Sequence, residues 1–158
     1  MEHIWGALKF VASIGLVSVL TSIFGWFFVY KNSRLLQKRS ETWSIVKNIS
    51  DNLKEIEVSA RKYWLPNDDK LINGMIFQHE VTSLLGETER WLIHLSYRID
   101  IAGDYKPMVT DLFRDATADI EKFTDLSEQK RLRISAVVSK RTKIIKSLID
   151  ESYRKKFL

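Results

Sequence analysis

The sequence predicts an all-α fold, in which one N-terminal transmembrane helix is followed by a four-helix antiparallel cytoplasmic bundle. Residues 10–30 form an uncharged, mostly apolar run, and the two prolines, Pro66 and Pro107, divide the remainder into helical segments. No segment keeps the period-two alternation of a strand. We therefore divide the chain into an N-terminal tail and transmembrane helix, residues 1–31, and a cytoplasmic helical domain, residues 32–158.

The run from Phe10 to Tyr30 has the length of a membrane-spanning helix. At about 1.5 Å per residue it extends for roughly 30 Å, the thickness of the hydrocarbon core of a bilayer. Trp5 and Trp26 lie near its two ends, where aromatic side chains favour the membrane interface. A cleaved signal peptide is the main alternative, but its start is basic and its apolar run is shorter, whereas this chain carries Glu2 near its start.

The charges that flank the run predict its orientation. Before the first acidic residue, Glu41, the run is followed by four basic residues: Lys31, Arg34, Lys38 and Arg39. The positive-inside rule places the N-terminus outside and the C-terminal domain in the cytoplasm, as in a single-pass protein of the bacterial inner (plasma) membrane. The chain has no cysteine, which fits a reducing compartment.

One face of the predicted transmembrane helix carries small residues. They recur every three or four positions and are Ala12, Gly15, Ser18, Ser22 and Gly25. Small residues allow transmembrane helices to approach closely, so this face favours a homo-oligomer with packed transmembrane helices. The alternative is that glycine, serine and alanine are simply common in membrane spans.

A heptad seam marks the first cytoplasmic helix, which we expect from about Asn32 to Trp64 and which can continue the transmembrane helix without a break. The seam residues are Val46, Ile49, Leu53, Ile56, Ala60 and Tyr63. A turn follows, with Asn67 or Asp68 as the N-cap of a second helix from about residue 69 to residue 101. Its expected apolar surface consists of Ile72, Met75, Ile76, Leu84, Leu85, Trp91, Leu92, Leu95 and Ile99.

Two further helices complete the predicted bundle. The third runs from about Pro107 to Thr124, and its expected inward residues are Val109, Leu112, Phe113, Ala116, Ile120 and Phe123. Ser127 caps the fourth, which reaches toward Lys156 and buries Ile134, Val137, Val138, Ile144, Ile145, Leu148 and Ile149. Residues 153–158 mix basic and apolar side chains, which is typical of an interfacial tail, and a frayed terminus is the alternative.

The net charge of +5 is unevenly distributed. Residues 126–158 carry ten basic and three acidic residues, whereas residues 51–125 carry nine and fifteen. We interpret part of the basic fourth helix as a site for phosphates, formed by Lys130, Arg131, Arg133, Lys140, Arg141 and Lys143. The alternative is cross-helix ion pairing with an acidic ladder on the third helix, Asp111, Asp115 and Asp119. The acidic middle and the lack of a recognition motif argue against long nucleic acid as a partner.

The motifs of several enzyme classes are missing. His79-Glu80 does not continue into the HExxH zinc motif, and there is no phosphate loop, nucleophile elbow or dinucleotide fingerprint. The lack of cysteine excludes a thiol nucleophile and thiolate metal sites. We therefore expect neither catalytic residues nor a metal or cofactor, and we do not expect an enzyme.

The order of membrane span, basic flank, helical domain and basic last helix resembles the small membrane-anchored helical effectors of type III CRISPR defence that sense cyclic tetra-adenylate. The resemblance covers the whole chain as architecture and rests on no diagnostic motif. It implies an oligomeric antiviral effector that binds a cyclic oligoadenylate and damages the membrane. It also implies that the basic residues of the fourth helix contact phosphates and that Trp64 or Trp91 stacks on adenine.

Two other functions compete with this interpretation. The chain could be a membrane-anchored coiled-coil scaffold or accessory subunit with no small ligand, which the heptad seam from Val46 to Tyr63 favours. A holin-like pore former ranks last, since a cytoplasmic domain of this size exceeds what such a protein needs.

Overall fold

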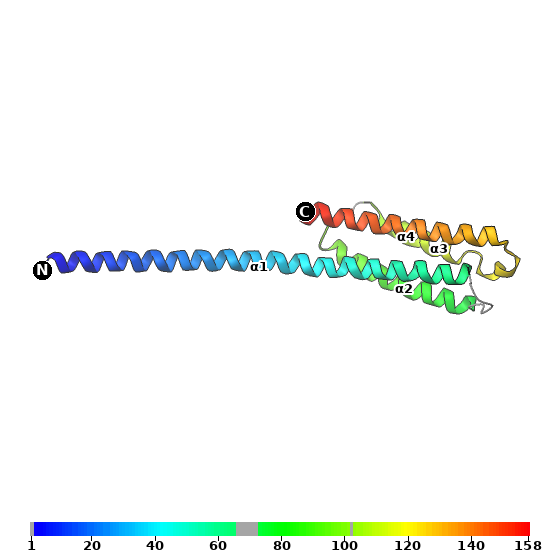
Figure 1. The fold of residues 1–158 in the computed structure, drawn as a ribbon, viewed down its shortest axis with the longest axis horizontal. Coiled ribbons are helices and arrows are strands. Elements are labelled where there is room, and N and C mark those ends of the chain that lie inside the picture. The colour runs from blue at the N-terminus through cyan, green and yellow to red at the C-terminus, as the bar shows by residue number, and fades with distance from the viewer. Residues whose placement is uncertain (1, 66–72, 102) are drawn as a thin grey trace. The chain divides into compact units, whose positions relative to one another are not determined.

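The computed structural model describes residues 2–65, 73–101 and 103–158, without the side chains of residues 2–14 and 16. These residues form helices and no strand, which confirms the all-α prediction. The elements, drawn in Figure 1, are α1 (Glu2–Trp64), α2 (Gly74–Ser96), α3 (Tyr105–Thr117), the 3₁₀ helix η1 (Ile120–Asp125) and α4 (Glu128–Phe157). The chain divides into two compact units, Met1–Glu41 and Thr42–Leu158, and the division falls within α1.

The first unit consists of the N-terminal part of α1. In the described part of the chain, no helix combines the length and the hydrophobicity that a membrane crossing requires. The predicted span from Phe10 to Tyr30 begins with side chains that lie outside that part, those of residues 10–14 and 16. From Val17 to Tyr30 every side chain is exposed, including those of Phe24, which is 62% exposed, and Phe28, which is 70% exposed.

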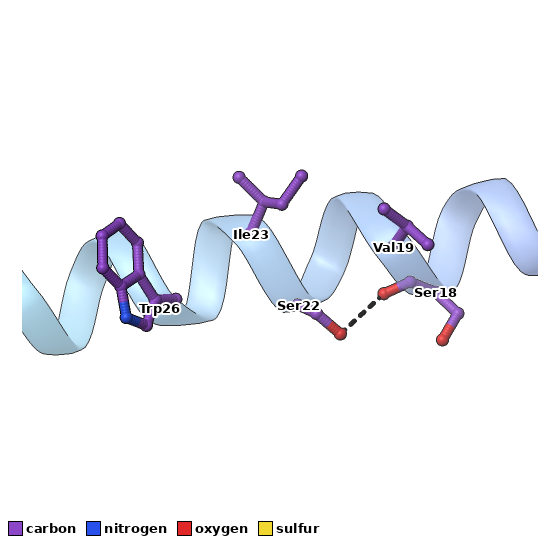
Figure 2. Close-up of a pocket in the computed structure, with 5 residues that line it drawn as sticks. All are labelled: Ser18, Val19, Ser22, Ile23 and Trp26. Atoms are coloured by element: carbon purple, nitrogen blue, oxygen red, sulfur yellow. Dashed lines mark hydrogen bonds between the residues drawn. The ribbon is translucent and has the colours of Figure 1, made fainter.

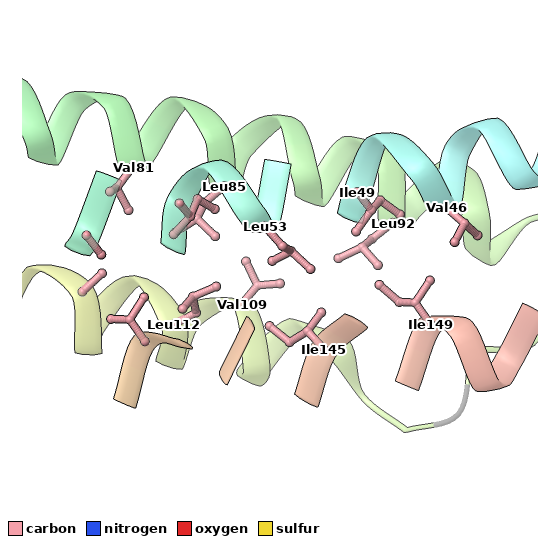
Figure 3. Close-up of a cluster of buried hydrophobic side chains, with 14 of the residues drawn as sticks. Val46, Ile49, Leu53, Val81, Leu85, Leu92, Val109, Leu112, Ile145 and Ile149 are labelled. Atoms are coloured by element: carbon pink, nitrogen blue, oxygen red, sulfur yellow. The ribbon is translucent and has the colours of Figure 1, made fainter. Parts of the chain in front are cut away.

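The second unit is a bundle in which α2, α3, α4 and the C-terminal part of α1 share one core, and successive helices run in opposite directions (Figure 1). All six seam residues from Val46 to Tyr63 are buried and at most 5% exposed, and Thr42 extends the same stripe by one turn. Figure 3 shows the seam facing apolar side chains of the other three helices, among them Leu92, Leu112 and Ile145. The heptad seam is therefore the α1 side of the core of this chain.

The first loop and α2 differ from the sequence prediction. The predicted caps Asn67 and Asp68 lie outside the described residues, as does Ile72. The described N-cap is Asn73, whose side-chain oxygen accepts a hydrogen bond of 2.9 Å from the backbone of Met75. α2 begins at Gly74, and its inward face runs through Phe77 and Val81, so Met75 and Ile76 are exposed rather than in the core.

The predicted third helix is broken in two, because the end of α1 supplies hydrogen bonds at the break. The indole Nε1 of Trp64 donates to the carbonyl of Ala116 at 3.2 Å, in the last turn of α3, where carbonyls lack helical partners. The hydroxyl of Tyr63 donates to the carbonyl of Ile120, the first residue of η1, and burial raises the pKa of this hydroxyl. Ile120 and Phe123 thus pack on the core from η1 rather than from a continuous helix.

The fourth helix was predicted closely. The side chain of Ser127 accepts a hydrogen bond from the backbone of Lys130, which confirms Ser127 as the N-cap. The helix continues to Phe157, and Leu158 donates its backbone N–H to the carbonyl of Arg154 at 2.8 Å. The C-terminal residues are therefore helical rather than frayed. Among the predicted inward residues, Ile144 is 47% exposed and lies outside the core.

We expect the substitution Gly86→Ala to raise the free energy of unfolding by about 0.5–1 kcal/mol, because alanine favours a helix interior and no atom lies within 4 Å of the added Cβ. Gly74→Ala is the matched control in the same helix. Its Cβ would lie 2.6 Å from Cγ2 of Ile120 and 3.0 Å from the hydroxyl oxygen of Tyr63, so we expect it to lower stability. Thermal unfolding of the full chain in detergent micelles, followed by circular dichroism, measures both; equal effects would contradict this packing.

Truncation of Leu112 tests whether α3 belongs to the core. Leu112 is fully buried, and we expect Leu112→Ala to cost about 2–5 kcal/mol of unfolding free energy. The same substitution at Leu132, which is 55% exposed on α4, should change stability by no more than about 0.5 kcal/mol. Urea denaturation provides the comparison, and a Leu112→Ala variant as stable as Leu132→Ala would exclude the α3 packing described above.

Candidate anion-binding surface

α4 positions the basic residues that the sequence singled out, and it divides them into an outer and an inner set. Lys130, Arg133, Lys140 and Lys143 are exposed and form no ion pair with the described residues. Arg133 and Lys140 are seven positions apart, so they lie above one another on the same helix face. These four cations remain available to an anion in solution.

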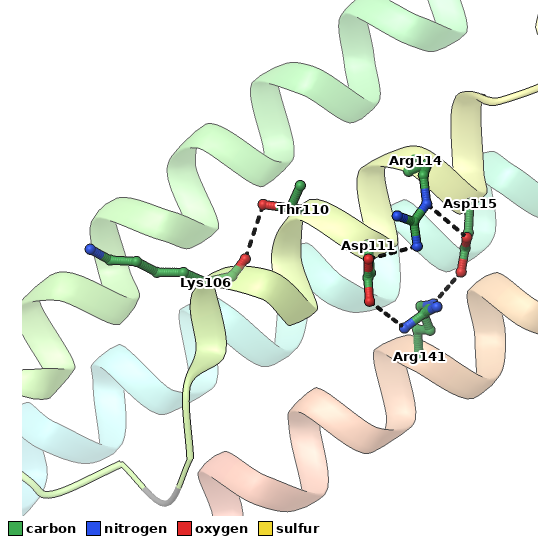
Figure 4. A network of polar contacts seen from close by, with 6 residues as sticks. All are labelled: Lys106, Thr110, Asp111, Arg114, Asp115 and Arg141. Carbon is green, nitrogen blue, oxygen red and sulfur yellow. Dashed lines mark hydrogen bonds and ion pairs between the residues drawn. The ribbon is translucent and has the colours of Figure 1, made fainter.

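Arg141 belongs to the inner set and is already neutralised. Its Nη1 lies 3.3 Å from Oδ2 of Asp111, and its Nε contacts a carboxylate oxygen of Asp115 (Figure 4). Arg114 binds the same two carboxylates, with its Nη2 at 2.7 Å from Oδ1 of Asp111. Two guanidinium groups therefore share two carboxylates across α3 and α4. This is the cross-helix pairing that the sequence left open as the alternative, so a phosphate would have to displace carboxylates to reach Arg141.

Arg131 also turns toward the protein. Its guanidinium carbon lies 4.9 Å from the ring centroid of Phe123, a cation–π arrangement that connects α4 to η1. The Nε atom is buried and has no hydrogen-bond partner among the described residues. Arg131 thus contributes to packing at the start of α4, and its half-buried side chain is less accessible to an anion than that of Arg133.

The two tryptophans predicted to stack on a base have different surroundings. Trp64 is fully buried, and it packs against Tyr63 and Phe77 with its indole N–H already bonded. A base cannot reach this ring, so Trp64 is corrected from a stacking residue to a core residue. Trp91 is half-buried on α2, where its Nε1 donates to Glu87 at 3.4 Å and its ring centroid lies 6.1 Å from that of His94.

The small-residue face is exposed along the described part of α1. Ala12 lies outside the residues whose side chains are described, whereas Gly15, Ser18, Ser22 and Gly25 are exposed. The hydroxyl of Ser22 donates to the carbonyl of Ser18 at 2.8 Å, within the helix. Figure 2 shows Ser18 and Ser22 at a shallow hollow that Val19, Ile23 and Trp26 complete. The hydroxyl of Ser22 therefore has its hydrogen-bond acceptor within its own helix.

Sequence reasoning missed two grooves between helices. One lies beside α1 and α2 and is lined by Glu55, Met75, Ile76, His79, Glu80, Ser83 and Leu84. The other lies between α2 and α3 and includes Glu89, Lys106 and Phe113. Neither contains a cation of α4. The exposure of Met75 and Ile76 follows from the buried stripe of α2, because Phe77, Val81 and Leu85 recur every four positions and place Met75 and Ile76 on the outer face.

A third hollow lies on α4 itself and does contain α4 cations. Its lining comprises Lys143, Lys146, Ser147, Asp150, Glu151 and Arg154. The two acids offset part of the positive charge there. The arrangement can therefore bind an anion electrostatically at the helix surface, but it does not form an enclosed phosphate pocket.

Comparisons with protein-family models, with curated protein sequences and with solved structures find no match to this chain.

We expect Arg141→Gln and Asp115→Asn to destabilise the bundle non-additively, with a coupling energy of about 1 kcal/mol, because the two side chains contact each other while partly buried. Lys140→Gln, at the neighbouring exposed position, should show no coupling with Asp115→Asn. Urea denaturation of the unaltered chain and of the single and double variants gives the four unfolding free energies of the double-mutant cycle. Additive effects of Arg141→Gln and Asp115→Asn would mean that this ion pair contributes nothing to stability.

Proposed function

We propose that this chain is a single-pass membrane-anchored effector whose helical unit binds an anionic nucleotide messenger, of the cyclic oligoadenylate class, and acts on the membrane as a homo-oligomer in antiviral defence. The observation that carries the proposal is the exposure of many large apolar side chains on the uncharged part of α1 from Val17 to Tyr30. A helix that exposes many large apolar side chains and no charge favours an apolar surrounding, and a lipid bilayer provides one.

The charges of the chain support the remaining parts of the proposal. Lys31, Arg34, Lys38 and Arg39 follow the apolar segment, which favours a cytoplasmic helical unit. The exposed cations Lys130, Arg133, Lys140 and Lys143 supply a surface for a phosphate-rich ligand. In a cyclic oligomer each copy would present this surface around one axis, which suits a ligand of matching symmetry. Trp91 is the remaining candidate for stacking on a base.

An anchored scaffold with no small ligand is the alternative function. Its support was the heptad seam from Val46 to Tyr63, which would pair with another helix in a coiled coil. The seam residues are instead buried against α2, α3 and α4 of the same chain. No unpaired seam is left for a coiled-coil partner in the described part of the second unit, so the effector is the better-supported function.

A charge in the middle of the apolar segment tests the anchor. We expect Leu20→Arg to move the full chain from the alkali-resistant membrane fraction to the soluble or aggregated fraction, because arginine at the centre of a span costs about 2.5–3.5 kcal/mol. Leu132→Arg, on the exposed face of α4, is the control and should leave the chain in the membrane. Extraction of the unaltered chain by alkali would exclude the anchor.

The messenger is tested on the full chain in detergent micelles. Titration calorimetry with cyclic tetra-adenylate at two salt concentrations should give an affinity that falls with salt, since phosphate contacts are screened. Lys140→Gln should weaken binding, and Lys106→Gln on α3 serves as the charge-matched control. The absence of binding would exclude the messenger and leave the anchor standing.

A further inference from the structure

The C-terminal end of α4 is an ordered helix end with exposed cations. Arg154, Lys155 and Lys156 are consecutive and exposed, and Leu158 is 82% exposed. On the opposite side of the helix, Tyr153 is buried and Phe157 is half-buried. The helix end therefore has a side fixed to the bundle and a side that presents three positive charges with an apolar residue beside them.

Tilted aromatic contacts connect this end to α1. The ring of Tyr153 lies 5.2 Å from that of Trp43 and 5.0 Å from that of Phe157, measured between centroids. Trp43 is nevertheless 51% exposed, although a tryptophan in contact with a core is usually covered. Half-exposed tryptophan beside lysine and arginine is the combination that favours the headgroup region of a membrane, where rings sit at the interface and cations meet phosphates.

The charge near this end favours an anionic surface. Three exposed lysines, Lys140, Lys143 and Lys146, precede the terminal cations on α4. Asp150 and Glu151 are the acids in the same stretch. Six exposed cations, besides the paired Arg141, thus stand against two acids over residues 140–156, and a negatively charged surface would be attracted to them.

The chain also limits how far this end lies from the apolar segment. Trp43 is thirteen residues beyond Tyr30, so the two are at most about 45 Å apart in any arrangement of the units. If residues 10–30 cross a bilayer, the end of α4 that contacts Trp43 is tethered within about 45 Å of the apolar segment, and this tether raises its effective concentration at the lipid surface.

We propose that the C-terminal end of α4, residues 153–158, is a second membrane contact that binds the headgroups of anionic phospholipids. This proposal rests on the membrane anchor of the proposed function. The lysines and arginine supply the charge, Leu158 inserts at the surface, and the contact between the rings of Trp43 and Tyr153 holds the helix end in place. The bundle is thereby attached to the membrane at a second point besides the transmembrane helix.

The lack of cysteine allows a site-specific test in the full chain. Leu158→Cys is labelled with an environment-sensitive fluorophore, and the chain is reconstituted into vesicles of phosphatidylcholine alone or with phosphatidylglycerol. We expect at least about twofold higher emission, shifted to shorter wavelength, in the anionic vesicles. The combined substitution of Arg154, Lys155 and Lys156 by glutamine should abolish this difference. A label at Thr124→Cys, an exposed position in η1 at the other end of α4, should not respond to phosphatidylglycerol.

Any result other than these would overturn either the headgroup contact or the membrane anchor. Equal emission from the Leu158→Cys label in both kinds of vesicle, or an equal response at Thr124→Cys, would overturn the headgroup contact. If the emission rises with the protein-to-lipid ratio rather than with the phosphatidylglycerol content, the labelled helix end contacts a second copy of the chain. This result would also overturn the headgroup contact. Flotation with pure phosphatidylcholine vesicles reports the anchor separately. A chain that does not float would overturn the anchor, and the headgroup contact that rests on it.

Discussion

The bundle depends on one apolar stripe of α1, from Thr42 to Tyr63, which provides a common wall for the other three helices. Its residues alternate three and four positions apart, so they stay on one side of the helix for six turns. Burial of large residues such as Leu53 and Ile56 supplies the main stabilising free energy, because apolar burial is worth about 25 cal/mol per Å². The polar faces of α2, α3 and α4 are consequently turned outward.

The end of α1 also determines how the chain turns between α3 and α4. Trp64 and Tyr63 each donate a hydrogen bond to a carbonyl near the break between α3 and η1. A buried carbonyl without a partner costs about 1–3 kcal/mol, so these two donors stabilise the break where it lies. The same residues form an aromatic cluster with Phe77 and Phe123, which closes this end of the core.

Local patterns allowed the helices, the seam and the Ser127 cap to be predicted, because each depends on residues a few positions apart. The break after Thr117 could not be predicted in this way, since the hydrogen-bond donor Trp64 lies 52 residues from its acceptor, Ala116. The candidate site shows the same limit. Composition identified the cations of α4, but only the packing of α3 separates Arg141, which pairs with Asp111 and Asp115, from Lys140, which remains exposed.

The distribution of the core along the sequence has a consequence for the order in which the protein is made. The stripe on α1 is synthesised first, whereas the last buried residue of α4, Tyr153, follows 89 residues after Trp64. At about 5–20 residues per second, a ribosome needs roughly 4–18 s to synthesise the residues from Trp64 to Tyr153. During this interval the nascent chain exposes an apolar surface that the finished protein hides, so a copy terminated between α1 and the end of α4 presents that surface to quality control.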